Sequence, residues 1–303
     1  MGSGIALACA KGGSHVKVWD IQDEATALAL IKVRSALDTL VESNLMTEND
    51  AESSLQCITV TNQMVEAVKD AELIFEVIPE NLALKKRIFR KLDSICGHEV
   101  ILASNTSTFK IATLASATKA QDRVIGTHWM NPPYLLRLVE VIPNAKTSNE
   151  AVDTVRTFLA SIGKQAILCK DTPGFLINRM HSALLVEVIS IVEQGIATVQ
   201  DIDKAWTQFL GPRYCVVGPF QLMDSFGLDT ELSQYSYLHK TVKHSKFKPP
   251  RLLKRKVRRK QLGLKTGEGF YDYSEKNVQS IIAERDRRFI RLIQFLNERI
   301  TRS

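Results

Sequence analysis

Short apolar runs rich in β-branched residues alternate with longer amphipathic stretches over roughly the first 170 residues. The apolar runs predict strands, and the longer stretches predict helices. The predicted strands are 15–20, 56–61, 73–78, 100–103, 123–129, 138–142 and 165–169. The predicted helices are 24–44, 63–71, 81–95, 110–118 and 150–162. This alternation is typical of an α/β fold, in which helices cover a doubly wound parallel sheet.

The pattern changes after the segment Asp171-Thr172-Pro173-Gly174. Residues 175–196 form one long apolar-rich stretch that predicts a helix, and the later segments also have helical periodicity. We therefore expect an α/β domain over residues 1–170 and an all-helical domain over residues 171–303. No stretch approaches the ~20 apolar residues of a membrane span, so we expect no membrane partner.

Composition changes this picture little, because 45% hydrophobic and 24% charged residues are ordinary values for a globular protein. The net charge of +7 comes from one segment, since residues 240–260 hold eleven Lys or Arg and no acid. The rest of the chain has 29 basic and 33 acidic residues, a net charge of −4. A basic surface that coats nucleic acid is thus excluded.

Cysteine usage indicates the compartment. The five cysteines are scattered without metal-ligand spacing, which favours free thiols in a reducing, cytoplasmic setting; they are Cys9, Cys57, Cys96, Cys169 and Cys215.

His128 and Glu140 are the first candidates for chemistry. His128 ends one predicted strand, and Glu140 lies inside the apolar run 138–142. A carboxylate among apolar neighbours is costly unless it is paired. We therefore expect a buried pair in which Glu140 fixes the tautomer of the imidazole and raises its basicity, as a general base requires.

Other polar residues lie where open α/β sheets bind ligands, beyond the carboxyl ends of strands. Ser107 closes the run Ser-Asn-Thr-Ser after the strand 100–103, although Ser107 or Thr108 could instead cap the next helix. Asp20 ends the strand that follows a Gly-x-Gly start, which suits the ribose of NAD rather than NADP. The alternative for Asp20 is a turn residue.

Together these segments resemble the 3-hydroxyacyl-CoA dehydrogenase family. The resemblance rests on eight segments in family order, namely MGSGIALA, the strand end at Asp20, FEVIPENLALKKRIF, SNTSTFKI, GTHWMNPPYLLRLVEVI, DTPGFLINR, GPFQLMDSFGLD and GLKTGEGFYDY. It implies an NAD-binding Rossmann domain, followed by a helical domain that forms a homodimer. It also implies reversible oxidation of an L-3-hydroxyacyl-CoA, the chemistry of fatty acid β-oxidation.

The resemblance also implies roles for single residues. His128 would be the base and Glu140 its partner, while Ser107 and Asn178 would complete the catalytic set and contact the substrate. The residues implied around NAD are Gly2, Asp20, Glu80, Lys85, Ser107, Asn131 and Lys265. For Lys85 and Lys265, an ordinary surface lysine is the alternative.

Three alternatives stay open within the resemblance. Pro-Pro-Tyr after Asn131 and the segment 213–217 are similar to branches that act on free 3-hydroxy acids such as carnitine or gulonate. A non-enzymatic, crystallin-like descendant of the fold is a second alternative. The basic segment 240–260 could attract the phosphates of CoA or could be a solvated helical face.

The first residues of the chain match only part of a glycine fingerprint, which leads to a further expectation. Gly2 falls on the third glycine of the fingerprint G-x-G-x-x-G, so the first two glycines and the first strand would lie upstream. In the strand order 3-2-1-4-5-6 that strand is central, between 15–20 and 73–78. We expect these two strands to lack a partner on their facing edges, and about ten residues of apolar strand and Gly-x-Gly to precede Met1. A chain of only 303 residues would then bind NAD weakly.

Overall fold

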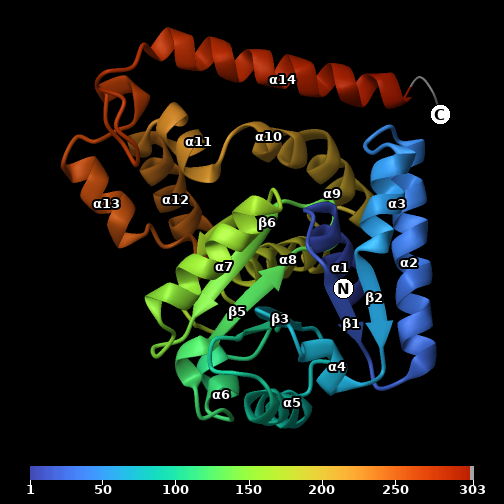
Figure 1. The fold of residues 1–303 in the computed structure, drawn as a ribbon. Coiled ribbons are helices and arrows are strands. Elements are labelled where there is room, and N and C mark those ends of the chain that lie inside the picture. The colour runs from blue at the N-terminus through green and yellow to red at the C-terminus, as the bar shows by residue number, and fades with distance from the viewer. Residues whose placement is uncertain (301–303) are drawn as a thin grey trace. The chain divides into compact units, whose positions relative to one another are not determined.

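The computed structural model describes residues 1–300. The chain forms two compact units, Met1–Leu185 and the residues from Val186 onward. The division falls within helix α8 (Ile177–Glu193), whereas the sequence pattern placed it near Asp171. Figure 1 shows the order of the elements along the chain, and each unit is described by itself below.

All seven predicted strands are present, each within two residues of its predicted ends. They are β1 (Val16–Trp19), β2 (Ile58–Thr61), β3 (Leu73–Glu76), β4 (Ile101–Ser104), β5 (Val124–Trp129), β6 (Leu138–Pro143) and β7 (Gln165–Leu168). The predicted α/β fold with a parallel sheet is present, except that β6 runs antiparallel to β5. β7 then pairs parallel to β6. Eight residues join β5 to β6, too few for a crossover helix, so the chain turns back.

The strands form two sheets. One has the order β1-β2, and the other has the order β3-β4-β5-β6-β7. Within residues 1–300, β1 pairs only with β2 and β3 only with β4, so each of these two strands has one edge without a hydrogen-bonded strand. In keeping with an open edge, Leu73, Ile74 and Phe75 of β3 are only half-buried, whereas β4 and β5 are buried throughout.

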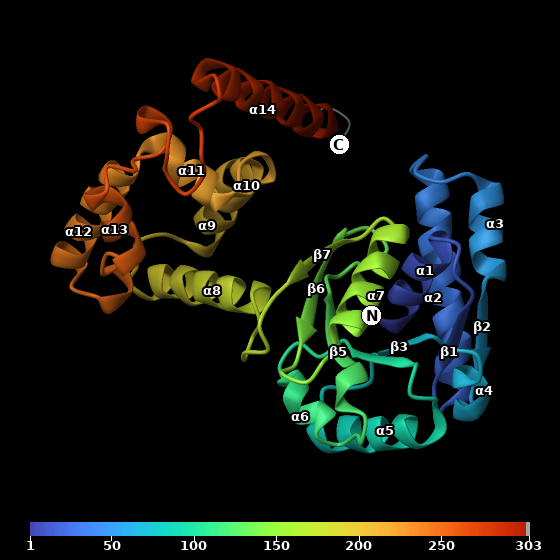
Figure 2. The ribbon, with the colours of Figure 1, turned by 60° about the vertical axis from the view of Figure 1, so that its left-hand side comes forward.

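Helices cover both faces of the five-stranded sheet (Figure 2). The helices of this unit are α1 (Gly2–Lys11), α2 (Asp23–Glu42), α3 (Glu48–Gln56), α4 (Met64–Val68), α5 (Leu82–Ile95), α6 (Ile111–Ala115) and α7 (Asn149–Ser161). The helix α3 escaped prediction because its sequence is mostly polar, and its start is fixed by Thr47, which accepts from the Asp50 N–H.

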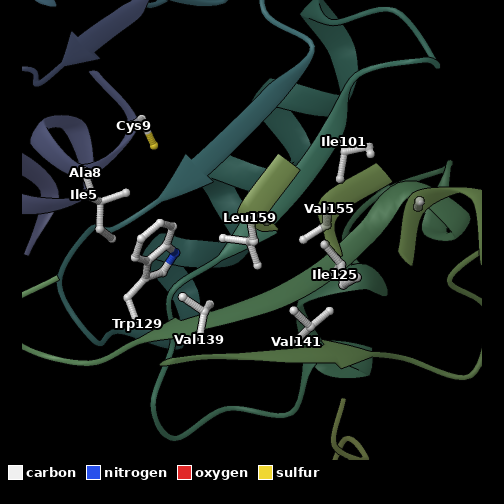
Figure 3. Packing of buried hydrophobic residues seen from close by; sticks show 12 residues of the cluster. Ile5, Ala8, Cys9, Ile101, Ile125, Trp129, Val139, Val141, Val155 and Leu159 are labelled. Atoms are coloured by element: carbon white, nitrogen blue, oxygen red, sulfur yellow. The ribbon is translucent and has the colours of Figure 1, made fainter. Parts of the chain in front are cut away.

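Helices α1 and α7 pack on one face of the sheet. Val155 and Leu159 of α7 point toward Val139 and Val141 of β6, with Trp129 beside them (Figure 3). On the other face, α5 and α6 bury their apolar sides against β4 and β5. This double cover explains the near-continuous apolar composition of the central strands, and it leaves the strand ends free to carry polar side chains.

The second unit contains only helices among its described residues, apart from isolated bridges. The α-helices that follow α8 are α9 (Val199–Ala205), α10 (Gly211–Val216), α11 (Pro219–Phe226), α12 (Leu228–Val242), α13 (Arg251–Arg258) and α14 (Val278–Ile300). A π-helix spans Trp206–Leu210, and short 3₁₀ helices span Ser245–Phe247 and Leu264–Thr266. Buried Asp224 of α11 accepts from the N–H groups of Phe270 and Tyr271 and from the Tyr273 hydroxyl, which fixes the glycine-rich loop after α13. None of the helices in residues 1–300 is both long and apolar enough to cross a membrane.

Candidate active site

The hairpin of β5 and β6 brings His128 and Glu140 together. Their backbones lie directly opposite each other in the antiparallel register, which accounts for the spacing of twelve residues in the sequence. The His128 Nδ1 lies 2.6 Å from Glu140 Oε2, and the glutamate is 0% exposed. The predicted buried pair is thus present.

Every polar neighbour of the Glu140 carboxylate is a donor. Oε1 accepts from the N–H groups of Leu176 and Ile177 at 2.8 and 3.0 Å, and the Cys169 thiol lies 3.7 Å away. Burial alone would raise the pKa of Glu140, but the hydrogen bonds from His128, Ile177 and Leu176 outweigh it and hold this pKa below its ordinary value of 4.5. Glu140 is therefore a stable anion at neutral pH.

This anion determines which nitrogen of His128 carries the proton. A carboxylate without a proton only accepts, so Nδ1 must carry a proton, and in the neutral imidazole this tautomer leaves the lone pair on Nε2. Phe175 packs against the imidazole, with ring centroids 6.0 Å apart. The arrangement is that of a general base whose tautomer is fixed by the carboxylate of Glu140.

The segment 171–178 connects the pair to the rest of the site. The Asp171 carboxylate accepts from the N–H groups of Ile111 and Ala112 and so caps α6, which rules out Ser107 or Thr108 as its cap. Asn178 Nδ2 donates to the carbonyl oxygen of Ser107 at 3.0 Å. The structure thereby joins two of the predicted catalytic residues directly.

The predicted NAD residues near the chain start lie at strand and helix ends. Gly2 begins α1, whose N-terminal N–H groups have no side-chain cap. Asp20 follows β1 and accepts from the Gln22 N–H, a turn bond that involves only Oδ1. A free helix N-terminus and a carboxylate after the next strand suit the phosphates and ribose of a dinucleotide, so these residues fit NAD.

Asn131 lies in the turn that follows β5, on the exposed surface. A groove of about 410 Å³ is lined by this residue together with Ser3, Gly4 and Lys32. A side chain at Gly4 would meet Pro133 at 2.7 Å, so glycine permits the close approach of α1 to the turn. Asn131 is thus beside the first turn of α1.

Glu80 and Lys85 form an ion pair with 3.3 Å between Nζ and Oε2. Lys85 is only 1% exposed, so the reading of Lys85 as an ordinary surface lysine is wrong. Lys265 lies in the second unit, where it is exposed and pairs with Asp229 at 2.6 Å.

Sequence reasoning missed two acidic residues of the site. Asp171 caps α6, sixty residues earlier in the chain, and no local sequence pattern predicts such a contact. Glu76 is buried at the end of β3, where it binds Lys85 and Ser104. Its position inside the apolar run 73–78 is the same signal that identified Glu140.

Comparisons with known proteins find matches over most of the chain. Residues 1–172 match the model of the 3-hydroxyacyl-CoA dehydrogenase NAD binding domain, and residues 174–273 match that of the C-terminal domain. A probable 3-hydroxybutyryl-CoA dehydrogenase of Bacillus subtilis is 39% identical, over 91% of this chain and 95% of that protein.

Two further relatives cover almost the whole chain. The 5-formyl-3-hydroxy-2-methylpyridine 4-carboxylate 5-dehydrogenase of Mesorhizobium japonicum is 33% identical over 99% of this chain and 96% of its own length. The crystal structure of the 3-hydroxyacyl-CoA dehydrogenase of Archaeoglobus fulgidus is 31% identical, covers 98% of this chain and 95% of that chain, and superposes with a TM-score of 0.82.

Proposed function

The chain belongs to the 3-hydroxyacyl-CoA dehydrogenase family of NAD-dependent oxidoreductases, and on that premise we propose that it oxidises L-3-hydroxyacyl-CoA to 3-ketoacyl-CoA, reversibly. The observation that carries this proposal is the buried pair of His128 and Glu140, with 2.6 Å between Nδ1 and Oε2. A pair of this kind has the chemistry needed to remove a proton from a hydroxyl group. This reaction would place the protein in fatty acid β-oxidation.

In the proposed mechanism His128 Nε2 takes the proton of the 3-hydroxyl group while a hydride leaves C3. Bound NAD supplies the hydride acceptor. The anionic Glu140 stabilises the imidazolium that forms, which makes proton removal easier. In the reverse direction the imidazolium returns its proton to the oxygen of the ketone.

The remaining predicted residues orient the reactants. Ser107 and Asn178, which contact each other, would bind the oxygen of the substrate at C3. Gly2, Asp20, Glu80, Ser107 and Asn131 would hold NAD. Positioning of this kind supplies much of the rate enhancement of such enzymes, because it replaces a bimolecular encounter with an oriented one.

The first test measures NADH consumption at 340 nm with acetoacetyl-CoA, free acetoacetate, dehydrocarnitine and 3-dehydrogulonate, each at two salt concentrations. We expect turnover with acetoacetyl-CoA and an efficiency kcat/KM at least about 100-fold lower without the CoA moiety. Faster turnover of a free keto acid would overturn the CoA proposal. Silence with all four would favour the non-enzymatic, crystallin-like reading.

The free-acid alternative has one specific observation in its favour. The Mesorhizobium japonicum relative, named for a pyridine carboxylate, matches 99% of this chain, and acts by its name on a compound without CoA.

The salt series also tests the basic segment 240–260. Contacts to CoA phosphates weaken as salt rises, whereas a solvated face leaves KM unchanged. In α13, Lys254 and Arg258 are exposed, in keeping with the solvated face.

We also propose a homodimer, for which an exposed apolar stripe is the support. Val186, Ile189, Val192 and Ile196 follow one another at helical spacing along α8 and just beyond it, and Val186 and Ile196 are each 68% exposed. Exposed apolar stripes of this kind usually mark interaction sites. A second copy of the chain presents the same stripe and could cover it symmetrically.

A charge in this stripe should separate the subunits. We expect Ile189→Lys to lower the mass measured by light scattering from twice 34.0 kDa to 34.0 kDa. The matched control is Gln194→Lys, which lies outside the stripe and should remain a dimer. Dimers of both variants, or a monomeric wild-type protein, would contradict the assignment of this surface.

The proposal includes a cytoplasmic location. All five cysteines are free, including exposed Cys215, which suits a reducing compartment.

A further inference from the structure

Glu76 is a buried carboxylate that the proposed mechanism does not use. It ends β3 directly opposite Ser104, which ends the neighbouring strand β4. The Glu76 side chain is 1% exposed, and its Oε2 accepts from the Ser104 hydroxyl at 2.6 Å. Its Oε1 accepts from the N–H of Ile78 at 2.8 Å. A buried anion that is so fully hydrogen-bonded is held in one orientation.

Lys85 of α5 neutralises this anion. Its Nζ lies 2.7 Å from Glu76 Oε1 and also donates to the carbonyl oxygen of Ile78 at 3.2 Å. On its other side the same ammonium lies 3.3 Å from Glu80 Oε2. Lys85 thus connects a fully buried carboxylate with one whose side chain is 34% exposed.

Glu80 in turn holds the loop after β4. Its Oε1 accepts from the Thr106 hydroxyl at 2.5 Å and from the Thr108 N–H at 3.1 Å. Ser107 lies between these two residues, and its carbonyl oxygen accepts from Asn178. A continuous chain of ion pairs and hydrogen bonds therefore leads from Glu76 to the loop that carries Ser107.

We propose that Glu76 is a positioning residue for NAD binding, acting through Lys85 and Glu80 on the loop of Thr106 and Ser107. This inference rests on the proposed function, in which Glu80 and Ser107 contact the cofactor. Lys85, 1% exposed, is the bridge between the two carboxylates. Without the charge of Glu76, Glu80 would be the one remaining counterion of the Lys85 ammonium among the described residues, and the ammonium would draw that carboxylate inward.

The molecule provides a matched control at a different place in the same unit. Arg123, just before β5, pairs with Asp93 of α5 at 2.9 Å, and both side chains are buried. Arg123 lies just before the first residue of β5, whereas Glu76 and Ser104 are the last residues of β3 and β4. Loss of either pair should cost stability, because it leaves a buried charge without a partner. Only loss of the Glu76 charge should alter NAD binding.

The test compares Glu76→Gln with Asp93→Asn. We expect Glu76→Gln to raise the dissociation constant of NADH, measured by fluorescence, and the KM for NADH about tenfold, with a smaller change in kcat. Asp93→Asn should lower Tm but leave both constants within about twofold. The isosteric Gln keeps the volume of the side chain, and the milder Ser104→Ala, which removes one hydrogen bond and no charge, serves if Glu76→Gln does not fold.

A double variant adds a second readout. The double variant Glu76→Gln with Lys85→Met lacks both buried charges. Because Glu76 is proposed to act through Lys85, the double variant should bind NADH no more weakly than Lys85→Met alone. Unchanged NADH affinity in Glu76→Gln, or an equal loss in Asp93→Asn, would overturn the positioning role. Because NADH binding needs no substrate, a wild-type protein that binds NADH but reduces no acyl-CoA would refute the proposed function alone.

Discussion

His128→Gln is expected to lower kcat for the reduction of acetoacetyl-CoA by about 10³-fold, the range that general acid–base catalysis commonly supplies. Glutamine is close to histidine in size and its amide can still donate a hydrogen bond to Glu140. It cannot, however, hold and release a proton at neutral pH. Steady-state NADH consumption with purified variants measures the effect.

NADH binding should survive this substitution, since no residue assigned to the cofactor is changed. Fluorescence titration should give a dissociation constant within about twofold of the wild-type value, well under the ~1.4 kcal/mol of a tenfold change. The control is His181→Gln, because His181 is an exposed histidine of α8 that is outside the His128–Glu140 pair. If turnover of His128→Gln stayed near that of this control, another group would have to be the base.

The sequence pattern predicted the positions of the strands more completely than it predicted the directions in which they run. Apolar runs mark where a strand lies, but the alternation of strands and helices does not say which way each strand runs. The reversal at β6 was nevertheless encoded, because the eight residues between Trp129 and Leu138 are too few for a crossover. That reversal also places His128 directly opposite Glu140, whereas the cost of burying a lone carboxylate had predicted only that the two residues pair.

The cost of burying a lone carboxylate could also have identified Glu76, which lies in the apolar run 73–78 as Glu140 lies in 138–142. Lys85 could not have been recognised as buried by itself, since a lysine on a helix usually extends into solvent. Its burial follows only from the carboxylate of Glu76 beneath it. Asp171 was beyond sequence reasoning for a different reason, because its partners, the N–H groups of α6, are sixty residues distant.

The open edges of β1 and β3 show a further difference between pattern and structure. β3 has the apolar composition of an inner strand and β1 is rich in valine, yet within residues 1–300 each is hydrogen-bonded to one neighbour only. An apolar pattern indicates the surroundings that suit a strand. The hydrogen bonds of the strand depend instead on whether another strand lies beside it. The partial exposure of Leu73 and Phe75 is the physical consequence of that difference.

Glu140→Gln is the second substitution for which we expect a large effect, a fall in kcat of at least about 100-fold with little change in KM for the acyl-CoA. All polar neighbours of the carboxylate are donors, so the new NH₂ group has no acceptor among them in the present arrangement. The variant can satisfy its amide only if His128 moves its proton from Nδ1 to Nε2. The imidazole would then present a donor where the mechanism needs a base. The control is Glu150→Gln, an exposed glutamate in the first turn of α7.

The pH dependence of stability provides an independent check on the same residue. The pKa of Glu140 in the folded protein lies below its ordinary value of 4.5, so the unfolded chain takes up the proton first as the pH falls. The charge therefore stabilises the folded protein above pH 4.5 and loses this effect as the pH decreases through the folded-state pKa. Denaturant unfolding should show that wild type exceeds Glu140→Gln most at neutral pH, with a difference that shrinks in acid. A difference independent of pH, or a change confined to KM, would mean that Glu140 only fills space behind His128.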